Sequence, residues 1–329
     1  MTALLEIDNV SKRFTRKPSL IERALGKQAV TVRAVSSVNL NIRPGEVLGV
    51  VGESGCGKST LGRIVSGIYA PTEGRVLLEG KPVARGNDRN VRKLTPRVQM
   101  IHQDPFASLN PRMKIGEILA EGPRAHGLVS AKQAGALVAD LLEKVGLEPG
   151  YASRLPHQFS GGQRQRIAIA RALAMQPDLL VLDEAVASLD VSIQAQVLNL
   201  FMRIRQELGL TAIFISHDLS VVRHVCDRVA IMYLGRMVEL APAAELYAAP
   251  LHPYTQALFA SVPTLGTGKR DFHPIKGEIP SPVNPPAGCH FHPRCPSAGP
   301  RCRTEAPRLT ATSPGRSTAC HLHDGGTGA

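Results

Sequence analysis

The feature that most constrains the fold is the glycine-rich run at residues 52–59, GESGCGKS, which matches the phosphate-binding pattern G-x-x-x-x-G-K-[ST]. An apolar run at Val47–Val51 comes just before it and predicts a buried strand. From Lys58 onward the apolar residues fall at helical spacing, so a helix should follow. Because short β-rich runs and helical stretches alternate in this way over the first 240 residues or so, the sequence predicts an α/β fold.

The glycines of this run predict an anion site. They let the backbone turn tightly, so that consecutive N–H groups point inward at phosphate oxygens, and the following helix presents its positive end. Lys58 should reach the β- and γ-phosphates of a nucleotide, and the Ser59 hydroxyl should bind Mg²⁺. We interpret Cys56 as a small filler within the loop. The residues expected to bind ATP here are Gly52, Glu53, Ser54, Gly55, Cys56, Gly57, Lys58, Ser59 and Thr60.

Two acids complete the expected phosphate site. The apolar run Leu179–Leu182 predicts a second buried strand and leads into Asp183 and Glu184. Asp183 is expected to hold Mg²⁺, directly or through water. Glu184 is expected to point toward the water that attacks the γ-phosphate, and a general base of this kind contributes about 10²–10⁴-fold in rate. A third strand, Thr211–Ile215, should lead to His217.

Composition limits the class of protein. No apolar run approaches the roughly 18–20 residues of a membrane-spanning helix, and the first residues include Glu6 and Asp8 rather than a long apolar stretch. An integral membrane protein and an exported protein are therefore disfavoured. The net charge of +12 fits nucleic acid, anionic phosphates or a lipid surface, and equally a solvated basic face. No basic run interleaves with aromatic residues, so the nucleic-acid signal is weak.

Residues 159–163 carry a resemblance to a known family. They read FSGGQ and end 20 residues before Asp183. This resembles the signature motif LSGGQ of ABC-type ATPases, with Phe159 in the first place. The resemblance implies a P-loop NTPase fold of the ABC ATPase type, with a RecA-like core and a helical subdomain. It also implies that the start of a helix serves the nucleotide of the opposite subunit through Ser160, Gly161, Gly162 and Gln163.

Further positions match the same family. Gln103 in MIHQDP matches the glutamine that touches the metal or the attacking water and relays the state of the membrane partner. His217 in IFISHDLS matches the switch histidine that contacts the γ-phosphate. Residues 188–190 match the D-loop, and the resemblance places Asp190 among the nucleotide-binding residues. Phe14 stands where an aromatic ring usually stacks on adenine, although simple core packing of Phe14 stays open.

Four stretches narrow the resemblance. They look like the dipeptide/oligopeptide importer branch of the family, and within it like the second ATP-binding subunit. The four stretches are DEAVASLDVSIQAQV, MYLGRMVEL, LHPYTQALFASVP and GEIPSPVNPPAGC. Ala185 replaces the proline common after the catalytic glutamate, and Ala187–Ser188 replaces the usual Ser–Ala. Neither change removes a functional group from the phosphate site. Related importers carry glutathione, nickel or antimicrobial peptides, which stay open as cargo.

The resemblance also implies partners. An ATPase of this branch forms a heterodimer with a second ABC ATPase subunit on the cytoplasmic face of the inner membrane. It works there with two transmembrane permease subunits and an extracytoplasmic peptide-binding protein. The main rival is a nucleic-acid machine with the same ATPase head, but such proteins bring tandem cassettes, long coiled coils or inserted zinc modules. This chain has one cassette and no sustained heptads, so we expect no nucleic acid partner. A non-catalytic cassette is disfavoured by the presence of Lys58, Glu184 and His217.

The composition changes near residue 242, and 14 of the 25 prolines lie from there to residue 314. We therefore expect an ATPase domain over residues 1–250 and a Pro/Cys-rich C-terminal extension over residues 251–329. Proline at this density forbids long helices and central strands. The extension should bury little core of its own and should need a clip or a docking surface.

Four cysteines gather in this extension, at Cys289, Cys295, Cys302 and Cys320. Zinc sites usually contain a C-x₂₋₄-C knuckle, which this spacing lacks. Four cysteinates without knuckles suit a [4Fe–4S] cluster, whose iron corners lie farther apart, and importers of the resembled branch can hold such a cluster. Neighbouring histidines keep zinc open, and free thiols in a docking segment are the third possibility. A metal here would act as a structural clip.

Overall fold

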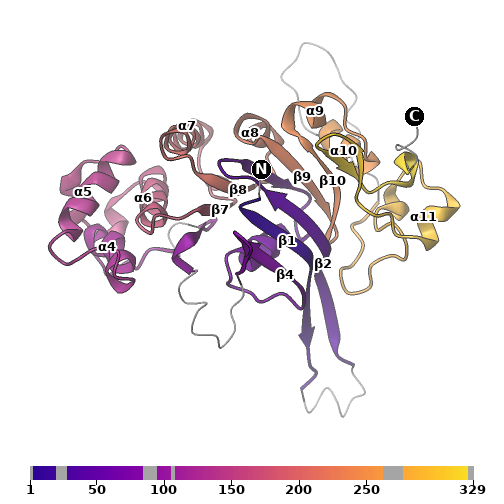
Figure 1. Cartoon of the computed structure of the whole chain (residues 1–329), viewed down its shortest axis with the longest axis horizontal. Coiled ribbons are helices and arrows are strands. Elements are labelled where there is room, and N and C mark those ends of the chain that lie inside the picture. The colour runs from indigo at the N-terminus through magenta and orange to yellow at the C-terminus, as the bar shows by residue number, and fades with distance from the viewer. Residues whose placement is uncertain (1–2, 20–27, 84–94, 105–107, 262–276, 325–329) are drawn as a thin grey trace.

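The computed structural model describes residues 3–19, 28–83, 95–104, 108–261 and 277–324. Its centre is an eight-stranded sheet in the order β11-β12-β10-β9-β3-β8-β7-β6 (Figure 1). The five strands from β9 to β6 run parallel, which confirms the predicted α/β fold. Their bounds are β3 Val47–Val51, β6 Val98–Ile101, β7 Leu179–Asp183, β8 Thr211–Ile215 and β9 Arg228–Tyr233.

The strands β3, β7 and β8 are buried at every residue, as parallel strands covered on both faces must be. Side chains alternate between the two faces along each strand. Leu48 and Val50 of β3 therefore belong to one apolar core, and Val47 and Val51 belong to another. The three strands expected from the apolar runs at 47–51, 179–182 and 211–215 are thus confirmed.

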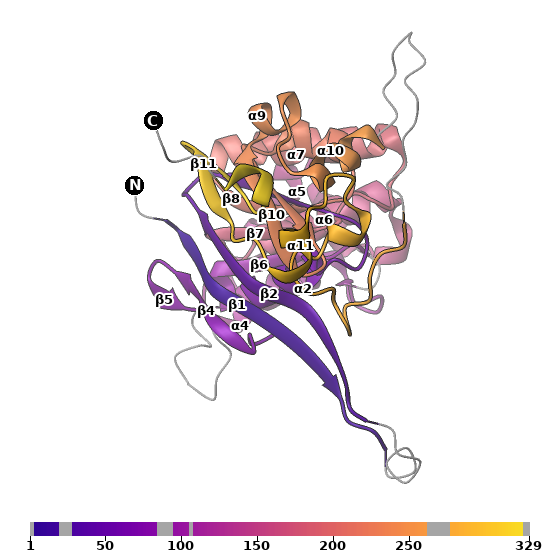
Figure 2. The same ribbon diagram turned by 90° about the vertical axis from the view of Figure 1, so that its right-hand side faces the viewer.

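A four-stranded antiparallel sheet, in the order β2-β1-β4-β5, shares the first of these cores with the central sheet and with helix α2 (Lys58–Val65). The β1–β2 pair extends well beyond the rest of this sheet as a two-stranded ribbon (Figure 2). The bounds of the four strands are β1 Leu5–Arg16, β2 Val30–Ile42, β4 Glu73–Leu78 and β5 Lys81–Pro82.

Helices form the second core on the other face of the central sheet. Three of them, α4, α5 and α6, make a lobe at one end of the molecule, on the left in Figure 1, which matches the expected helical subdomain. Within the described part of the chain, no helix has the length and apolar character needed to cross a membrane. The helices are α4 Ile115–Ala125, α5 Ala134–Lys144, α6 Gly161–Leu173, α7 Val191–Leu208, α8 Leu219–Val225 and α9 Ala243–Ala248.

The C-terminal extension continues the central sheet. Strand β12 (Arg316–Thr318) pairs with the edge of β10 (Arg236–Pro242), and β11 (Thr310–Ser313) pairs with β12. A buried ion pair of 2.8 Å joins Arg316 to Glu239 across this junction. The helices of the extension are short, as its prolines predict, and are α10 Pro253–Ala260 and α11 Pro300–Thr304. Single 3₁₀ turns lie at Thr95–Arg97, Pro149–Ser153, Pro156–Gln158, His292–Arg294 and His321–His323.

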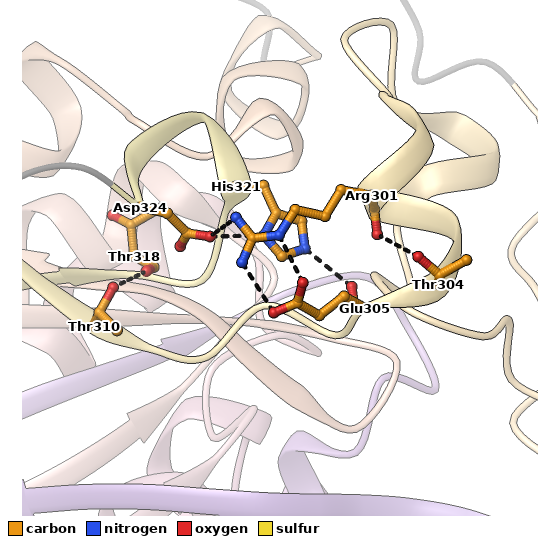
Figure 3. A network of polar contacts seen from close by, with 7 residues as sticks. All are labelled: Arg301, Thr304, Glu305, Thr310, Thr318, His321 and Asp324. Atoms are coloured by element: carbon orange, nitrogen blue, oxygen red, sulfur yellow. Dashed lines mark hydrogen bonds and ion pairs between the residues drawn. The ribbon is translucent and has the colours of Figure 1, made fainter.

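A polar network ties α11 to the end of the described chain (Figure 3). Arg301 holds the Glu305 carboxylate at 2.6 and 2.9 Å and the Asp324 carboxylate at 2.7 Å. His321 lies 2.8 Å from Asp324 and 3.0 Å from the carbonyl oxygen of Glu305. Because the Arg301 and Glu305 side chains are about half exposed, their ion pair contributes little to stability.

Candidate functional site

The phosphate loop wraps around the Lys58 side chain. The buried Lys58 ammonium donates to the carbonyl oxygens of Gly52 at 2.8 Å and Glu53 at 3.0 Å. Gly57 adopts φ 109°, and a Cβ at this position would lie 2.2 Å from the carbonyl oxygen of Ala34. Only glycine fits there, because a side chain would be both strained and sterically excluded. The strand, loop and helix expected from the sequence are therefore present, and the loop folds around the Lys58 ammonium group.

A cavity of about 460 Å³ opens beside this loop. Its size is within the range of small-molecule sites. It brings Gln103 and Glu184, which are distant in sequence, to the same space as the loop. Its wall draws on the loop, α2, β1, β2, the segments after β6 and β7, and the extension. The lining residues are Phe14, Val32, Ala34, Ser54, Gly55, Gly57, Lys58, Ser59, Thr60, Gln103, Glu184 and Pro282.

Three predicted nucleotide residues of the phosphate loop do not line the cavity, and neither does Asp183. Gly52 and Glu53 meet Lys58 through their carbonyl oxygens. The Cys56 thiol is 5% exposed, and burial raises its pKa, which fits a small filler rather than a reactive group.

Ser59 and Asp183 meet at the end of β7. The Ser59 hydroxyl donates to Asp183 Oδ1 at 2.8 Å. Burial raises the pKa of Asp183, and the Ser59 hydrogen bond opposes that rise. A hydroxyl beside a carboxylate suits Mg²⁺, which binds through few protein oxygens and completes its shell with water and phosphate oxygens. The donor chemistry of this pair therefore fits the expected cation.

Glu184 follows β7 in an uncommon backbone conformation, with φ 50°. Its N–H donates to the carbonyl oxygen of Ile215, the last residue of β8, at 2.9 Å, so the neighbouring strand holds this conformation in place. Its carboxylate Oε1 lies 3.4 Å from Nδ1 of His217. Gln103 is exposed and lines the cavity, whereas His217, whose side chain is 60% exposed, does not line it and meets it only through its contact with Glu184.

Phe14 of β1 is one of the residues that line this cavity. Its ring packs edge-to-face on Tyr69 at 5.5 Å, and Lys12 Nζ lies 5.2 Å from the ring centre. The residue remains 37% exposed. Phe14 can therefore pack against Tyr69 and also contact a ligand, because its ring lines the cavity as well.

The signature segment lies outside this cavity. Ser160 caps α6: its hydroxyl accepts from the Gln163 N–H at 3.3 Å, and Gln163 Oε1 accepts from the Ser160 N–H at 3.0 Å. Gly162 lets α6 approach α7, since a Cβ there would lie 2.4 Å from Ile193. Ser160 is exposed, as is Asp190 at the start of α7. The chain therefore does not bring residues 160–163 or Asp190 to its own phosphate loop.

The structure adds contacts that sequence reasoning missed. Pro282, in the extension, lines the cavity, and its carbonyl oxygen accepts the Arg33 N–H at 3.0 Å. Arg294 forms an ion pair with Glu53 of the phosphate loop. No spacing or periodicity signals such contacts, because they depend on how the extension folds back.

The four cysteines of the extension are free thiols, and the charges of Cys289, Cys295 and Cys302 each act on the pKa of Cys320. Burial raises the pKa of Cys289, Cys295 and Cys320, the last to about 11, and the charge of nearby Cys302 raises each further. Backbone N–H groups point at these sulfurs, among them those of residues 291, 297 and 322. Among the described residues, no three His, Cys, Asp or Glu side chains lie close enough to hold one metal ion.

The neighbouring histidines are engaged elsewhere. The Nδ1 atoms of His290 and His292 lie 3.0 and 2.9 Å from carbonyl oxygens, and His323 Nε2 lies 3.1 Å from another. Both ring nitrogens of His321 have partners within the network of Figure 3. These contacts leave fewer ring nitrogens available to a zinc ion than the sequence suggested.

The fold and the phosphate site define an ATP-binding cassette ATPase. Residues 35–187 match the family described as "ABC transporter", and residues 238–302 match "Oligopeptide/dipeptide transporter, C-terminal region". The structure resembles cbiO1 from Clostridium perfringens, part of the ABC transporter complex cbiONQ, with a TM-score of 0.62 and 28% identity, covering 75% of this chain and 91% of that one. The dimeric bacterial ABC transporter cassette MJ0796 gives the same TM-score and identity over 73% of this chain and 98% of its own.

Sequence relatives narrow this class. The oligopeptide transport ATP-binding protein AppF of Bacillus subtilis is 49% identical over 97% of both chains. A probable peptide ABC transporter ATP-binding protein of Sinorhizobium fredii is 51% identical over 97% of this chain and 90% of its own. The chain belongs to the family of peptide ABC transporter ATP-binding proteins.

Proposed function

We propose that this chain binds and hydrolyses ATP to energise uptake of dipeptides or oligopeptides through an ABC importer. The observation that carries the proposal is the cavity in which Lys58, Ser59 and Glu184 converge, in a chain whose relatives are peptide transport ATP-binding proteins. The match of residues 238–302 to the oligopeptide/dipeptide transporter region supports the same cargo class. In this proposal residues 1–250 are the ATPase domain, and residues 251–329 are the extension specific to the branch.

The residues of the cavity have distinct roles in this proposal. Lys58 and the loop N–H groups hold the triphosphate, and Ser59 and Asp183 hold Mg²⁺, which when bound neutralises phosphate charge. Glu184 accepts a proton from the attacking water, whose oxygen bonds to the γ-phosphorus as the bond to the bridging oxygen of ADP breaks. Gln103 orients the attacking water, and His217, beside Glu184, contacts the γ-phosphate. The products are ADP and inorganic phosphate.

The exposed signature segment supports a paired arrangement. Residues 160–163 form the capped start of α6, Ser160 is exposed, and none of the four lines this chain's own cavity, which supports a role for the positive end of α6 toward a neighbouring subunit. We propose a heterodimer with a second ABC ATPase, bound to two permease subunits at the cytoplasmic face of the inner membrane. A peptide-binding protein outside the membrane supplies the cargo. Closure around ATP and reopening after hydrolysis drive the permeases.

The cargo can be tested on the assembled transporter. We expect a several-fold rise in phosphate release when a peptide-loaded binding protein is added to the complex in lipid vesicles, because cargo favours the closed ATPase pair. Glutathione, Ni²⁺ and DNA, each tested under the same conditions, should give no rise. Stimulation by glutathione or Ni²⁺ alone would replace the cargo assignment, and stimulation by DNA without membrane subunits would support the rival function.

For the extension we propose a [4Fe–4S] cluster held by Cys289, Cys295, Cys302 and Cys320, with zinc as the alternative. Two features of the site support the cluster. The charges of the thiols act on one another's pKa values, so the thiols are near neighbours, and backbone N–H groups point at the sulfurs. Such N–H groups stabilise cluster thiolates. The cluster would clip a segment that has little apolar core.

Metal analysis decides this point. Anaerobically purified protein should be brown and should contain about four irons per chain. Serine at any of the four positions should remove the colour and raise the proteolytic sensitivity of the extension. Cys226→Ser is the matched control, because Cys226 is buried at the end of α8 beside Gly49 of β3 and should not affect iron content. One zinc without iron would establish the alternative, and the absence of both metals would contradict the clip.

A further inference from the structure

Arg294 reaches from the extension to the phosphate loop. Its two terminal nitrogens donate to the Glu53 carboxylate at 2.7 and 3.0 Å, in the two-pronged geometry that arginine makes with carboxylates. The Arg294 side chain is only 4% exposed and that of Glu53 is 20% exposed. Pairs at this depth are poorly screened by solvent, unlike the half-exposed Arg301–Glu305 pair. The contact joins residues 241 positions apart.

Arg294 lies beside buried aromatic side chains. Tyr233, Tyr254 and Phe291 form a buried aromatic cluster with ring centres 4.6 to 5.3 Å apart. The Tyr233 hydroxyl lies 3.4 Å from Arg294, and the Tyr254 hydroxyl accepts the Glu53 N–H at 2.9 Å. Both the backbone and the carboxylate of Glu53 are therefore held by residues beyond the ATPase motifs. None of these residues lines the cavity, so their contacts hold the phosphate loop from the side that faces away from the cavity.

The negative charge of Glu53 affects how the loop binds ATP. Glu53 is a carboxylate within a loop that must receive a triphosphate, and an unpaired negative charge at that place repels it. Arg294 neutralises this charge and keeps the carboxylate turned toward the extension. Pro282 shows that the extension also lines the cavity itself, so the contact is part of a wider junction.

We propose that Arg294 is a positioning residue for ATP binding, which neutralises and orients Glu53 and so makes nucleotide affinity depend on the C-terminal extension. This inference rests on the proposed assignment of residues 52–59 to the triphosphate. It predicts that a variant without Arg294 loses ATP affinity because the negative charge of Glu53 is then unpaired. Removing Glu53 as well should therefore restore binding.

The test is a double-mutant cycle on the full chain, with ATP dissociation constants measured by calorimetry in the presence of Mg²⁺ at fixed ionic strength. Arg294→Gln should weaken ATP binding about tenfold, because the uncovered carboxylate repels the phosphates. Glu53→Gln should bind ATP at least as tightly as the parent. The double variant should lie within about threefold of the parent, since neither charge remains.

A purely structural role for Arg294 predicts a different pattern. In that case Arg294→Gln would lower the unfolding temperature, and adding Glu53→Gln would bring no recovery of ATP affinity. That pattern, or unchanged ATP binding in Arg294→Gln, would overturn the proposal. If Arg294→Gln does not fold, Arg294→Lys takes its place. Lysine keeps the positive charge but loses the two-pronged hydrogen bonding of the guanidinium, so ATP binding should weaken roughly threefold. This loss of affinity should disappear when Glu53→Gln is added.

Two control variants make the result specific. Arg301→Gln changes another arginine of the extension, in the network of Figure 3, and should leave ATP affinity unchanged. Lys58→Ala removes the cation inside the loop and should abolish ATP binding. Normal binding by Lys58→Ala would refute the assignment of the phosphate loop itself. A defect in Lys58→Ala with none in Arg294→Gln would refute only the role of Arg294.

Discussion

Glu184→Gln is expected to bind ATP with the affinity of the parent chain and to lose about 10²–10⁴-fold in turnover. The amide keeps the size of the side chain and its place in the cavity wall but cannot accept the proton of the attacking water. The measurements are ATP binding by calorimetry and phosphate release in the assembled complex. The variant should therefore accumulate ATP in a closed ATPase pair, because binding persists and reopening requires hydrolysis.

Two comparisons sharpen this experiment. Lys58→Ala should lose ATP binding itself, because the phosphates no longer have a positive charge to pair with. Glu245→Gln is the matched control, since Glu245 is an exposed glutamate in α9 and should leave turnover unchanged. Turnover at the parent rate in Glu184→Gln would show that another group is the base, despite the 3.4 Å contact between Glu184 and His217.

Ser160→Arg is expected to abolish hydrolysis at the partner's ATP site while this chain still binds ATP in its own cavity. The reason is geometric: Ser160 is exposed at the start of α6 and lies outside the cavity of its own chain. A long side chain at this position blocks the N–H groups proposed to face the partner's nucleotide. The replacement also removes a helix cap, at a cost of about 1 kcal/mol, which an unfolding curve would detect.

The two sites of the pair can be separated by following the nucleotide that each one keeps. In a complex that carries Ser160→Arg, the partner's site should retain unhydrolysed ATP, while this chain's own cavity still binds ATP. Ser153→Arg places the same side chain at another exposed serine of the helical lobe and should have no such effect. Loss of ATP binding by the Ser160→Arg chain itself would contradict the assignment across the subunits.

Local patterns were sufficient for much of the core and of the ATP site. The buried strands β3, β7 and β8 follow from short apolar runs, and α2 follows from helical spacing after the glycine-rich loop. Parallel strands place their carboxyl ends at one edge of a sheet. Asp183 was therefore predicted to lie near Ser59, and the two are joined by a hydrogen bond across 124 positions.

Other features could not be predicted because they depend on contacts without a sequence period. The density of prolines correctly indicated short helices in the extension, but it gave no sign that β12 pairs with β10. It gave equally little sign that Pro282 would line the cavity. Phe14 was left between two interpretations because its exposure depends on Tyr69, which belongs to another part of the chain.

The sequence by itself determined the class of protein, the phosphate loop and the acids at the end of β7, since each is encoded within a short segment whose backbone geometry is local. Only the tertiary structure placed the extension against the phosphate loop and the cavity beside it. The pairing of Arg294 with Glu53 spans 241 positions and requires the extension to fold back over the loop. A buried charge pair of this kind is selected by the shape and polarity of the assembled core, which no single segment contains.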